Sequence, residues 1–371
     1  MRVAFVCTQD RGGPVDLTVA LARELAGRPG GPEVAVAGPR PVTSAGKVDG
    51  LLRPVEVRSK TDLAGARELR RILEAIGPDL VHAQDRRAAL VGATLARRCA
   101  AVTVATYHGV PDGAAGCWVR EGPLAGRRSA PGAAAVLTAD ALVARLTTAT
   151  VTPSWAMASF LRQRLHVPPA KLHVIANGVA LPPARPPEGP VRTFVSVGTF
   201  APAKAVGTLV DAFAAVARDR PGLRLLLVGD GEERHSCARR AAALGIDHLV
   251  EFTGYRVDVP DQLARADAFV LPSVNENLPL ALIEAMGAGL ACVASRVGGV
   301  AELLGGDAGL LVRPGDPDAL ATAMAALADE PALAPALGRA AAAAAQRRFS
   351  IGACADAHLA LWFRLLGGRR S

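Results

Sequence analysis

The feature that most constrains the fold of this chain is a repeated alternation of short apolar runs with longer amphipathic stretches. The short runs are almost uninterrupted sequences of apolar residues, as in MRVAFVC at the start of the chain. Such runs indicate strands that are buried on both faces of a sheet, and the stretches between them have the length of helices. The pattern therefore predicts an α/β protein whose parallel sheets are covered by helices on both faces.

The alternation occurs in two series along the chain. The first series predicts strands near Val3–Cys7, Val34–Ala37, Leu80–His82, Val102–Thr106, Thr150–Thr152 and Leu172–Ile175, with helical segments such as Val15–Leu25 and Leu63–Ile76 between them. The second series predicts strands near Thr193–Val197, Arg224–Val228, Val250–Thr253, Ala268–Leu271, Ala291–Ala294 and Gly309–Val312. Because open α/β sheets bind ligands at the carboxyl ends of their strands, we expect functional residues to follow these strands directly.

A proline-rich stretch, LPPARPPEGP at residues 181–190, separates the two series. Proline interrupts helices and central strands, so this stretch is predicted to be an interdomain linker. A length of 371 residues also exceeds what one hydrophobic core normally supports. We therefore expect an N-terminal domain at 1–185, a C-terminal domain at 186–350, and a helix within 351–371 that returns to the N-terminal domain.

Basic residues are concentrated in the first half of the chain. Residues 1–185 hold 24 Lys and Arg against 14 Asp and Glu, residues 186–371 hold 18 against 20, and the whole chain has a formal net charge of +8. This asymmetry predicts an anionic molecule or a membrane surface as a partner, with candidate contacts at Arg86-Arg87, Arg97-Arg98 and Arg127-Arg128. Arginines on solvated helix faces are the alternative. Aromatic residues do not interleave the basic ones, so no nucleic-acid partner is expected.

The cysteines and the N-terminal residues predict where the protein is found. The six cysteines are scattered, with no CxxC pair and no metal-ligand spacing with the seven histidines, so we expect reduced thiols. The chain shows no basic leader followed by an apolar segment and a cleavage site, and no apolar run of about 18 residues. These features predict a cytoplasmic protein, and the basic half allows peripheral attachment at the inner membrane face.

The segment SVNENLPLALIEAMGAG, residues 273–289, has the pattern of an anion-binding turn followed by a helix. It follows the apolar strand DAFVLP and places Glu276 and Glu284 eight positions apart. The turn can present backbone N–H groups to a phosphate, and the helix that begins at Leu280 adds the positive end of its dipole. Glu284 can accept hydrogen bonds from a ribose diol, and Glu276 from sugar hydroxyls. The alternative interpretation is a pair of exposed carboxylates at a helix start.

Other nucleotide-binding and metal-binding motifs are incomplete. Gly229-Asp230-Gly231 begins like a dinucleotide fingerprint, but Arg234 occupies the position of the third glycine, and no GxxxxGK[ST] loop is present. NAD-binding and ATP-hydrolysing sites are therefore not predicted. No Asp-x-Asp motif stands out, so we expect no metal and no cofactor, with Lys204 and the helix dipole supplying the positive charge.

Residues 273–289 strongly resemble the signature of glycosyltransferase family 4, the retaining GT-B enzymes, and the resemblance covers most of the chain. Further matches, in order, are Gly12-Gly13, PDLVHAQ at 78–84, TYHGVP at 106–111, VTPS at 151–154, VIANGV at 174–179, VGTFAPAK at 197–204, LLVGDGEE at 226–233, FTGY at 252–255, VGGVAELL at 297–304 and PGDPDAL at 314–320. The resemblance implies two Rossmann-like domains that face each other across a cleft, the second of which binds a nucleotide diphosphate sugar.

The resemblance also implies roles for individual residues of the second domain. Glu284 would hold the ribose and Glu276 would contact the donor hexose. Lys204 would neutralise the leaving diphosphate, since a fixed cation stabilises the charge that grows as the glycosidic bond breaks. The other implied donor contacts are Thr199, Gly254, Tyr255, Asn277, Leu278, Pro279 and Leu280.

In the first domain the resemblance implies that Gly12 and Gly13 let a loop approach the donor phosphates closely, since glycine has no Cβ. His108, at the end of the strand VTVAT, would contact the transferred sugar. His82 also ends a strand, and we expect it to be structural. The implied catalytic residues are His108, Lys204 and Glu276.

The chain departs from the family pattern at Thr199, where many members have an arginine, and at Ala180, where aspartate is common. The implied reaction moves a sugar from a UDP- or GDP-sugar to an acceptor hydroxyl with retention of configuration, in polysaccharide, glycolipid or natural-product biosynthesis. The acceptor would be anionic or lipid-linked. Two alternatives stay open: a GT-B epimerase or hydrolase of nucleotide sugars, and a non-catalytic nucleotide-sugar-binding protein.

Overall fold

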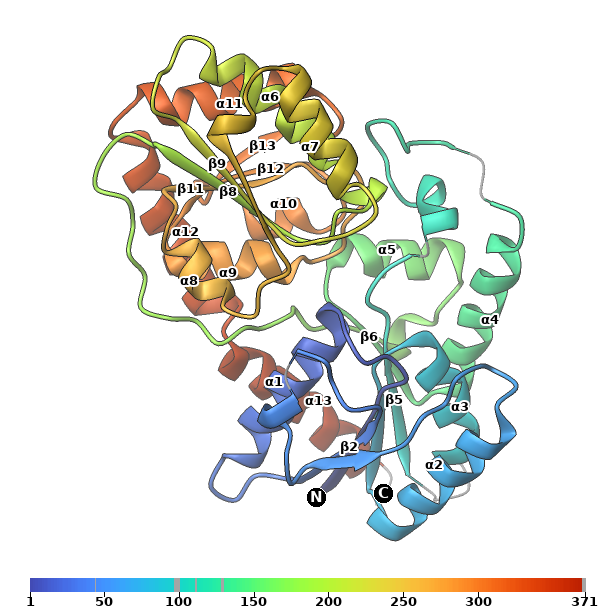
Figure 1. Cartoon of the computed structure of the whole chain (residues 1–371). Helices are drawn as coiled ribbons and strands as arrows, with labels where there is room; N and C mark the ends of the chain where they lie inside the picture. Colours follow the sequence, from blue (N-terminus) through green and yellow to red (C-terminus); the bar gives the residue numbers. More distant parts are fainter. Residues whose placement is uncertain (44, 97–100, 111, 128–129, 369–371) are drawn as a thin grey trace. The chain divides into compact units, whose positions relative to one another are not determined.

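The computed structural model describes residues 1–43, 45–96, 101–110, 112–127 and 130–368, which form two compact units (Figure 1). The first unit comprises Met1–Gly109, Pro131–Val179 and Ser350–Ser371, and the second comprises Val110–Ala130 and Ala180–Phe349. A few residues named in the sequence motifs and basic pairs lie outside the described residues, namely Arg97, Arg98, Cys99, Pro111 and Arg128.

The first unit is built on a sheet of seven parallel strands in the order β3-β2-β1-β4-β5-β6-β7. Their bounds are β1 (Arg2–Val6), β2 (Glu33–Gly38), β3 (Leu52–Pro54), β4 (Leu80–Ala83), β5 (Val102–Thr106), β6 (Ala149–Thr152) and β7 (Leu172–Val174). One face is covered by α1 (Gly13–Ala26) and α13 (Ile351–Gly367), and the other by α2 (Leu63–Ile76), α3 (Arg86–Ala96) and α4 (Ala133–Leu146), while α5 (Trp155–Arg164) packs against β6 and β7 (Figure 1).

Strand β3 is the strand of this sheet that the apolar pattern did not predict. It pairs three residues with β2, ends at Pro54 and is partly or fully exposed along its length. A short edge strand of this kind lacks the apolar run that marks a buried strand. The other strands of both sheets begin and end within one residue of their expected positions.

Helix α13 belongs to the first unit, and aromatic rings fix it there. Trp362 lies edge-on to Phe5 of β1, with 5.9 Å between ring centroids, and to His82 of β4, with 5.7 Å. The His358 ring lies 5.4 Å from that of His82. All four side chains are buried, so α13 contributes part of the interior of the first unit although it is the last helix in the sequence.

The second unit is built on six parallel strands in the order β10-β9-β8-β11-β12-β13. Their bounds are β8 (Thr193–Val197), β9 (Arg224–Val228), β10 (Val250–Gly254), β11 (Ala268–Leu271), β12 (Ala291–Ser295) and β13 (Leu310–Val312). The helices α6 (Val206–Ala217), α7 (Arg234–Ala243) and α11 (Pro317–Asp329) cover one face, α8 (Val259–Leu263), α9 (Leu280–Ala288) and α12 (Leu333–Arg348) cover the other, and α10 (Val300–Leu303) follows β12 (Figure 1).

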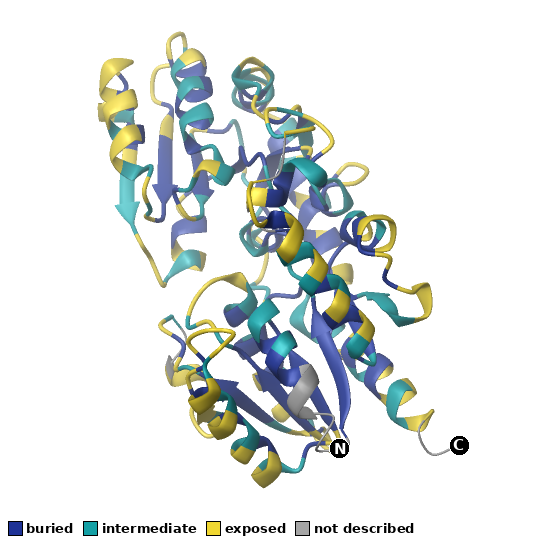
Figure 2. Ribbon diagram, turned by 90° about the vertical axis from the view of Figure 1, so that its right-hand side faces the viewer, coloured by how far each residue is buried: buried dark blue, intermediate teal, exposed yellow. Residues whose placement is uncertain are grey.

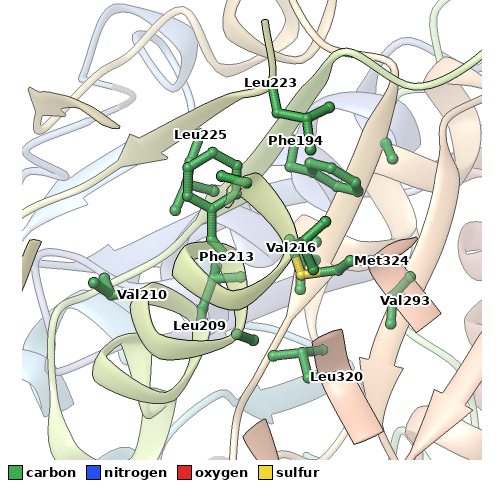
Figure 3. Packing of buried hydrophobic residues seen from close by; sticks show 14 of the residues in the cluster. Phe194, Leu209, Val210, Phe213, Val216, Leu223, Leu225, Val293, Leu320 and Met324 are labelled. Carbon is green, nitrogen blue, oxygen red and sulfur yellow. The ribbon is translucent and has the colours of Figure 1, made fainter. Parts of the chain in front are cut away.

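A large apolar core holds the second sheet against α6 and α11. Phe194 of β8 and Phe213 of α6 meet edge to face with 6.5 Å between ring centroids, and Leu209, Leu320 and Met324 pack around them (Figure 3). Burial of each large side chain of this kind contributes about 1.5–3 kcal/mol. The central strands of both sheets are buried, whereas the outer faces of the helices are exposed (Figure 2). The packing of this apolar core therefore fixes the positions of the strand ends in the second unit.

The two units differ from the expected domains in one internal segment and at the linker boundary. Residues 110–130 were expected in the N-terminal domain, but they belong to the second unit. A Cβ on Gly122 would lie 2.7 Å from the carbonyl oxygen of Pro314, so this segment packs directly on the loop that follows β13. The linker boundary also moves, because Ala180 is the residue at which the chain enters the second unit. Both corrections arise from tertiary packing, which local composition does not record.

Candidate nucleotide-sugar site

The strands at the centre of the second sheet position the predicted donor-binding residues. After β8 the chain continues through Gly198 and Thr199 to a 3-10 turn at Pro202–Lys204, and after the neighbouring β11 it continues through Pro272 to Ser273. A small pocket lies between these loops and is lined by Gly198, Thr199, Lys204, Leu227, Pro272 and Ser273. The structure thus brings the loop with Lys204 and the loop with Glu276 together at the carboxyl edge of the sheet, where α/β proteins bind ligands.

Lys204 and Glu276 form an ion pair at this edge, with 2.5 Å between Lys204 Nζ and Glu276 Oε1. The buried Ser273 hydroxyl donates to the same Oε1 atom at 2.9 Å. The Glu276 side chain is 8% exposed and that of Lys204 is 31% exposed, so the carboxylate is enclosed while the lysine side chain is partly exposed. The residues lie 72 positions apart in the sequence, and Ser273 was not among the predicted site residues.

Glycines let the β8 and β9 loops approach each other closely beside the pocket. A Cβ on Gly229 would lie 1.9 Å from the Gly198 carbonyl oxygen, and a Cβ on Gly231 would lie 2.6 Å from that of Phe200. Both glycines have positive φ angles, 139° and 153°. The Gly229-Asp230-Gly231 motif therefore serves loop packing in this structure, which agrees with the absence of a complete dinucleotide fingerprint.

The second part of the predicted motif forms a turn and helix α9. Asn277, Leu278 and Pro279 are buried, and Pro279 is the N-cap residue of α9, which begins at Leu280. The first N–H groups of a helix have no partner within it, so this turn is a natural seat for an anion. Glu284 lies in the next turn of α9 and is half-buried. The segment therefore forms a turn followed by a helix that carries Glu284, as its sequence pattern predicted.

Two of the other predicted donor contacts, Gly254 and Tyr255, lie at the end of β10. Gly254 has a φ angle of 72° and accepts a hydrogen bond from Gly229 N at 2.9 Å, so it shares the carboxyl edge of the sheet with the pocket. Tyr255 is 58% exposed. Thr199, which stands in place of the common arginine, is also exposed. The predicted donor-binding residues of the second domain thus end or follow three strands of one sheet, β10, β8 and β11, or lie on α9.

In the first unit His108 follows β5 and is half-buried. One ring nitrogen, Nε2, lies 3.2 Å from Gln84 Oε1, which follows the neighbouring strand β4. Burial lowers the pKa of His108 to about 4, and the nearby His358 and Arg86 act in the same direction. At neutral pH the imidazole is therefore uncharged, and it can act as a hydrogen-bond donor or acceptor but not as a cation.

A partly buried polar network supports the residues next to His108. Arg86 Nε donates to Asp140 Oδ2 at 2.9 Å, and the Tyr107 hydroxyl donates to the same oxygen at 2.8 Å. A second nitrogen of Arg86 donates to the Gly109 carbonyl oxygen. Arg87 donates to the carbonyl oxygen of Val57 at 2.7 Å. Arg86 of the expected Arg86-Arg87 patch is paired with Asp140, and binding of an external anion by this patch stays a prediction.

Gly12 and Gly13 form the turn between β1 and α1. Gly12 has a φ angle of 97°, caps α1 and accepts hydrogen bonds from the N–H groups of Val15 and Asp16. A Cβ added to Gly12 would meet only Pro14 Cδ, at 4.0 Å, so the space beside this turn is open. The turn is exposed and has the backbone conformation that favours glycine.

His82 has the structural position expected of it. It is fully buried, and its Nε2 atom lies 2.7 Å from the Thr106 hydroxyl. Burial lowers its pKa well below the usual value. Its other nitrogen, Nδ1, has no hydrogen-bond partner among the described residues. His82 contacts rings of α13 and thus belongs to the interior of the unit.

In the described part of the chain, no three His, Cys, Asp or Glu side chains gather as a metal site would require, and its cysteines are free. Helices that are long and apolar enough to span a bilayer are likewise absent from the described residues. Metal independence itself remains a prediction.

Two Rossmann-like units, each a parallel sheet covered by helices, are typical of the GT-B class of α/β proteins. The family model for Glycosyltransferase Family 4 matches residues 11–181, and the model for Glycosyl transferases group 1 matches residues 191–330. The chain belongs to this glycosyltransferase family, as its motifs indicated.

Curated relatives and solved structures agree with this assignment. The chain is 30% identical over 273 residues to glycogen synthase of Mycobacterium tuberculosis, which covers 71% of this chain and 63% of the relative. It is 34% identical over 201 residues to the lipopolysaccharide core biosynthesis glycosyltransferase LpsD of Rhizobium meliloti, covering 52% and 57%. The matched regions span between 15% and 63% of the length of the first curated relatives.

The fold as a whole is shared with HepE of Anabaena, solved in complex with UDP-glucose. That structure superimposes with a TM-score of 0.80 at 19% identity and covers 97% of this chain and 99% of its own. Sucrose-phosphate synthase of Thermosynechococcus elongatus gives a TM-score of 0.79 at 22% identity, with 99% of each chain covered. These similarities confirm the predicted GT-B fold.

Proposed function

We propose that this protein is a retaining glycosyltransferase that moves a sugar from a nucleotide diphosphate donor to an acceptor hydroxyl. The observation that carries the proposal is the Lys204–Glu276 pair beside the N-terminus of α9. This arrangement puts a cation, a sugar-hydroxyl acceptor and a phosphate-binding turn at one edge of the sheet. Membership of the glycosyltransferase family supports the same conclusion.

Lys204 is suited to the leaving diphosphate because its ammonium group has three donors and uses one on Glu276. It can therefore bind a phosphate oxygen without releasing the carboxylate. As the glycosidic bond breaks, negative charge grows on the diphosphate, and the fixed cation stabilises that charge more in the transition state than in the ground state. Glu276, held by Lys204 and Ser273, would accept hydrogen bonds from the hexose hydroxyls.

The remaining roles follow the same chemistry. Glu284 would accept hydrogen bonds from the ribose diol, and the N–H groups at the start of α9 would bind phosphate. Residues Gly254 and Tyr255 would lie against the base, and the Gly12-Gly13 turn would approach the donor phosphates. An uncharged His108 would hydrogen-bond the transferred sugar. Donor and acceptor would react on the same face of the sugar, which retains the anomeric configuration.

A UDP-sugar is the first donor to test, because the similar HepE structure contains UDP-glucose. We further propose a lipid-linked or other anionic acceptor, since relatives include enzymes of lipopolysaccharide core biosynthesis. The described residues that support an anionic partner are fewer than expected, because Arg86 is paired internally. A cytoplasmic location and metal-independent catalysis complete the proposal.

The proposal is tested by isothermal titration of UDP-glucose, GDP-mannose and ADP-glucose, followed by turnover with a mixture of candidate acceptors in the presence of EDTA. We expect one of the three to bind and to release its nucleotide only when acceptor is present. Nucleotide release without acceptor would indicate an epimerase or hydrolase instead. Binding without release under any acceptor would indicate a binding protein, and loss of turnover in EDTA would contradict metal independence.

A separate experiment tests membrane attachment. The protein is sedimented with vesicles of phosphatidylglycerol and phosphatidylcholine at low salt, where attraction between a basic surface and anionic lipid is strongest. Co-sedimentation that disappears at high salt is the expected result. Absence of binding at low salt would remove the membrane part of the proposal and favour a soluble acceptor.

A further inference from the structure

Trp118 contacts the loop that carries Glu276, although the two are far apart in the sequence. It lies in the segment 110–130, which the first half of the chain contributes to the second unit. The side chain is buried, and its indole Nε1 donates a hydrogen bond to Asn275 Oδ1 at 2.9 Å. Asn275 immediately precedes Glu276, so this bond ties the segment 110–130 to the loop of the proposed hexose-binding carboxylate.

The backbone around Trp118 is closely packed. A Cβ on Gly298 would lie 1.9 Å from the Glu276 carbonyl oxygen and 2.7 Å from Trp118 Cζ2. The next glycine, Gly299, donates from its N–H group to the Asn277 carbonyl oxygen at 2.8 Å. The indole ring, the glycine pair and the loop therefore form one close-packed layer in which the loop has no room to shift toward the ring.

The same loop, residues 273–279, is held from a second direction by the turn that carries Lys204. The N–H groups of Val274 and Asn275 lie 2.9 Å and 3.3 Å from the carbonyl oxygen of Ala203. The turn with Lys204 and the indole of Trp118 thus both contact this loop. We name residues 273–279 the donor loop.

We propose that Trp118 is a positioning residue for the donor loop, which sets the place of the Glu276 carboxylate relative to Lys204. The inference rests on the proposed function and deepens it, because it adds to the donor site a residue from a segment in which no donor contact was predicted. Small displacements of a reacting or binding group are costly to an enzyme, so a residue that holds such a group acts on donor binding without touching the donor.

The test compares Trp118→Phe with Trp155→Phe. The first variant keeps an aromatic ring against Gly298 and removes the indole donor, and the second makes the same substitution at a residue of the first unit that is 71% exposed. Affinity for UDP-glucose, GDP-mannose and ADP-glucose is measured by calorimetry. We expect Trp118→Phe to weaken the binding of the accepted donor about two- to tenfold, the range for one buried hydrogen bond, and Trp155→Phe to leave it unchanged.

A second pair of measurements separates positioning from general loss of stability. Asn275→Leu removes the acceptor of the same hydrogen bond, so the double variant Trp118→Phe/Asn275→Leu should bind donor no more weakly than the worse single variant. Amide hydrogen exchange of the peptide covering 273–279 should be faster in Trp118→Phe, with the melting temperature close to that of the wild type. Additive losses in the double variant would overturn the inference.

The outcomes distinguish this inference from the proposed function. If the wild type binds a donor and Trp118→Phe binds it equally well with unchanged exchange at 273–279, the positioning role is wrong and the proposed function stands. If the wild type binds none of the three donors, the proposed function loses its support. Hydrogen exchange in the unliganded protein then still decides whether Trp118 holds the loop.

Discussion

The two units are built on the same kind of sheet but place their polar groups differently. In the second unit the interior is apolar, and the charged residues Lys204 and Glu276 stand on loops at the edge of the sheet. In the first unit titratable rings are part of the interior, since His82 and His358 are buried against Phe5 and Trp362. In the second unit the residues that stabilise the fold are therefore separate from those of the proposed site. In the first unit buried histidines are part of the interior that stabilises the fold.

This difference indicates which substitutions and which pH changes each unit can tolerate without unfolding. In the second unit a site residue can be changed while the apolar core continues to hold the fold. In the first unit burial lowers the pKa of His82 and His358 and keeps them neutral, so acid acts on the stability of the whole unit. We test the comparison with four predictions, from the largest expected effect to the smallest.

The largest effect is expected at the cation of the second unit. Lys204→Ala should lower kcat about 100- to 1000-fold, the range for loss of one preorganised group that stabilises developing charge. The melting temperature should change far less than kcat, because Lys204 lies outside the apolar core. Steady-state kinetics and calorimetry measure the two quantities. Lys60→Ala, at an exposed position of the first unit, is the matched control. Unaltered turnover in Lys204→Ala would contradict its role.

A somewhat smaller effect is expected for the ribose contact. Glu284→Ala should weaken donor binding by about 1.5–3 kcal/mol, the scale of hydrogen bonds to a charged group. Isothermal titration with the accepted donor measures this change, and Glu302→Ala on α10 is a control of the same residue type in the same unit. Equal donor affinity in wild type and Glu284→Ala would sink the assignment.

The next effect concerns the pH dependence of the first unit. Burial lowers the pKa of His358 to about 4 in the folded state, whereas an unfolded histidine has a pKa of about 6.5. Between these values the unfolded chain binds the extra proton, so stability is present above pH 6.5 and falls as the pH drops toward 4. His358 alone should cost about 2 kcal/mol between pH 7.5 and pH 5.

Scanning calorimetry at several pH values measures this loss, and the His358→Gln variant should show a flatter profile in the same range. The exposed His248→Gln variant of the second unit is the control for removal of a histidine. A first unit that keeps its full stability at pH 5 would break the comparison, because its histidines would then not be enclosed.

The smallest effect is expected from backbone packing at the donor loop. Gly298 and Gly245 both have positive φ angles, 50° and 71°, but a Cβ would collide with the Glu276 carbonyl oxygen at Gly298 and meet nothing within 4 Å at Gly245. Gly298→Ala should therefore cost about 1–2 kcal/mol more unfolding free energy than Gly245→Ala. Urea unfolding of the two variants measures the difference. Equal costs would show that the donor loop can move away from Gly298.

Much of the fold could be predicted from the sequence because buried strands of parallel sheets have apolar runs. The strands of the second sheet appear in the sequence at the positions that the structure shows, to within one residue. Strand β3 was missed because an edge strand such as Leu52–Pro54 has little apolar surface to bury. The predicted donor-binding residues of the second domain also stand at one edge of its sheet, since each follows a strand or a helix start.

What the sequence by itself determined was the alternation of elements, the two-unit division in outline and the residue types of the donor motif. Those features depend on local periodicity and on short motifs, which neighbouring residues specify together. Only the tertiary structure decided that Lys204 pairs with Glu276, that Arg86 is neutralised by Asp140, and that the segment 110–130 packs beside the donor loop. These contacts join residues tens of positions or more apart, and their partners are chosen by packing rather than by sequence spacing.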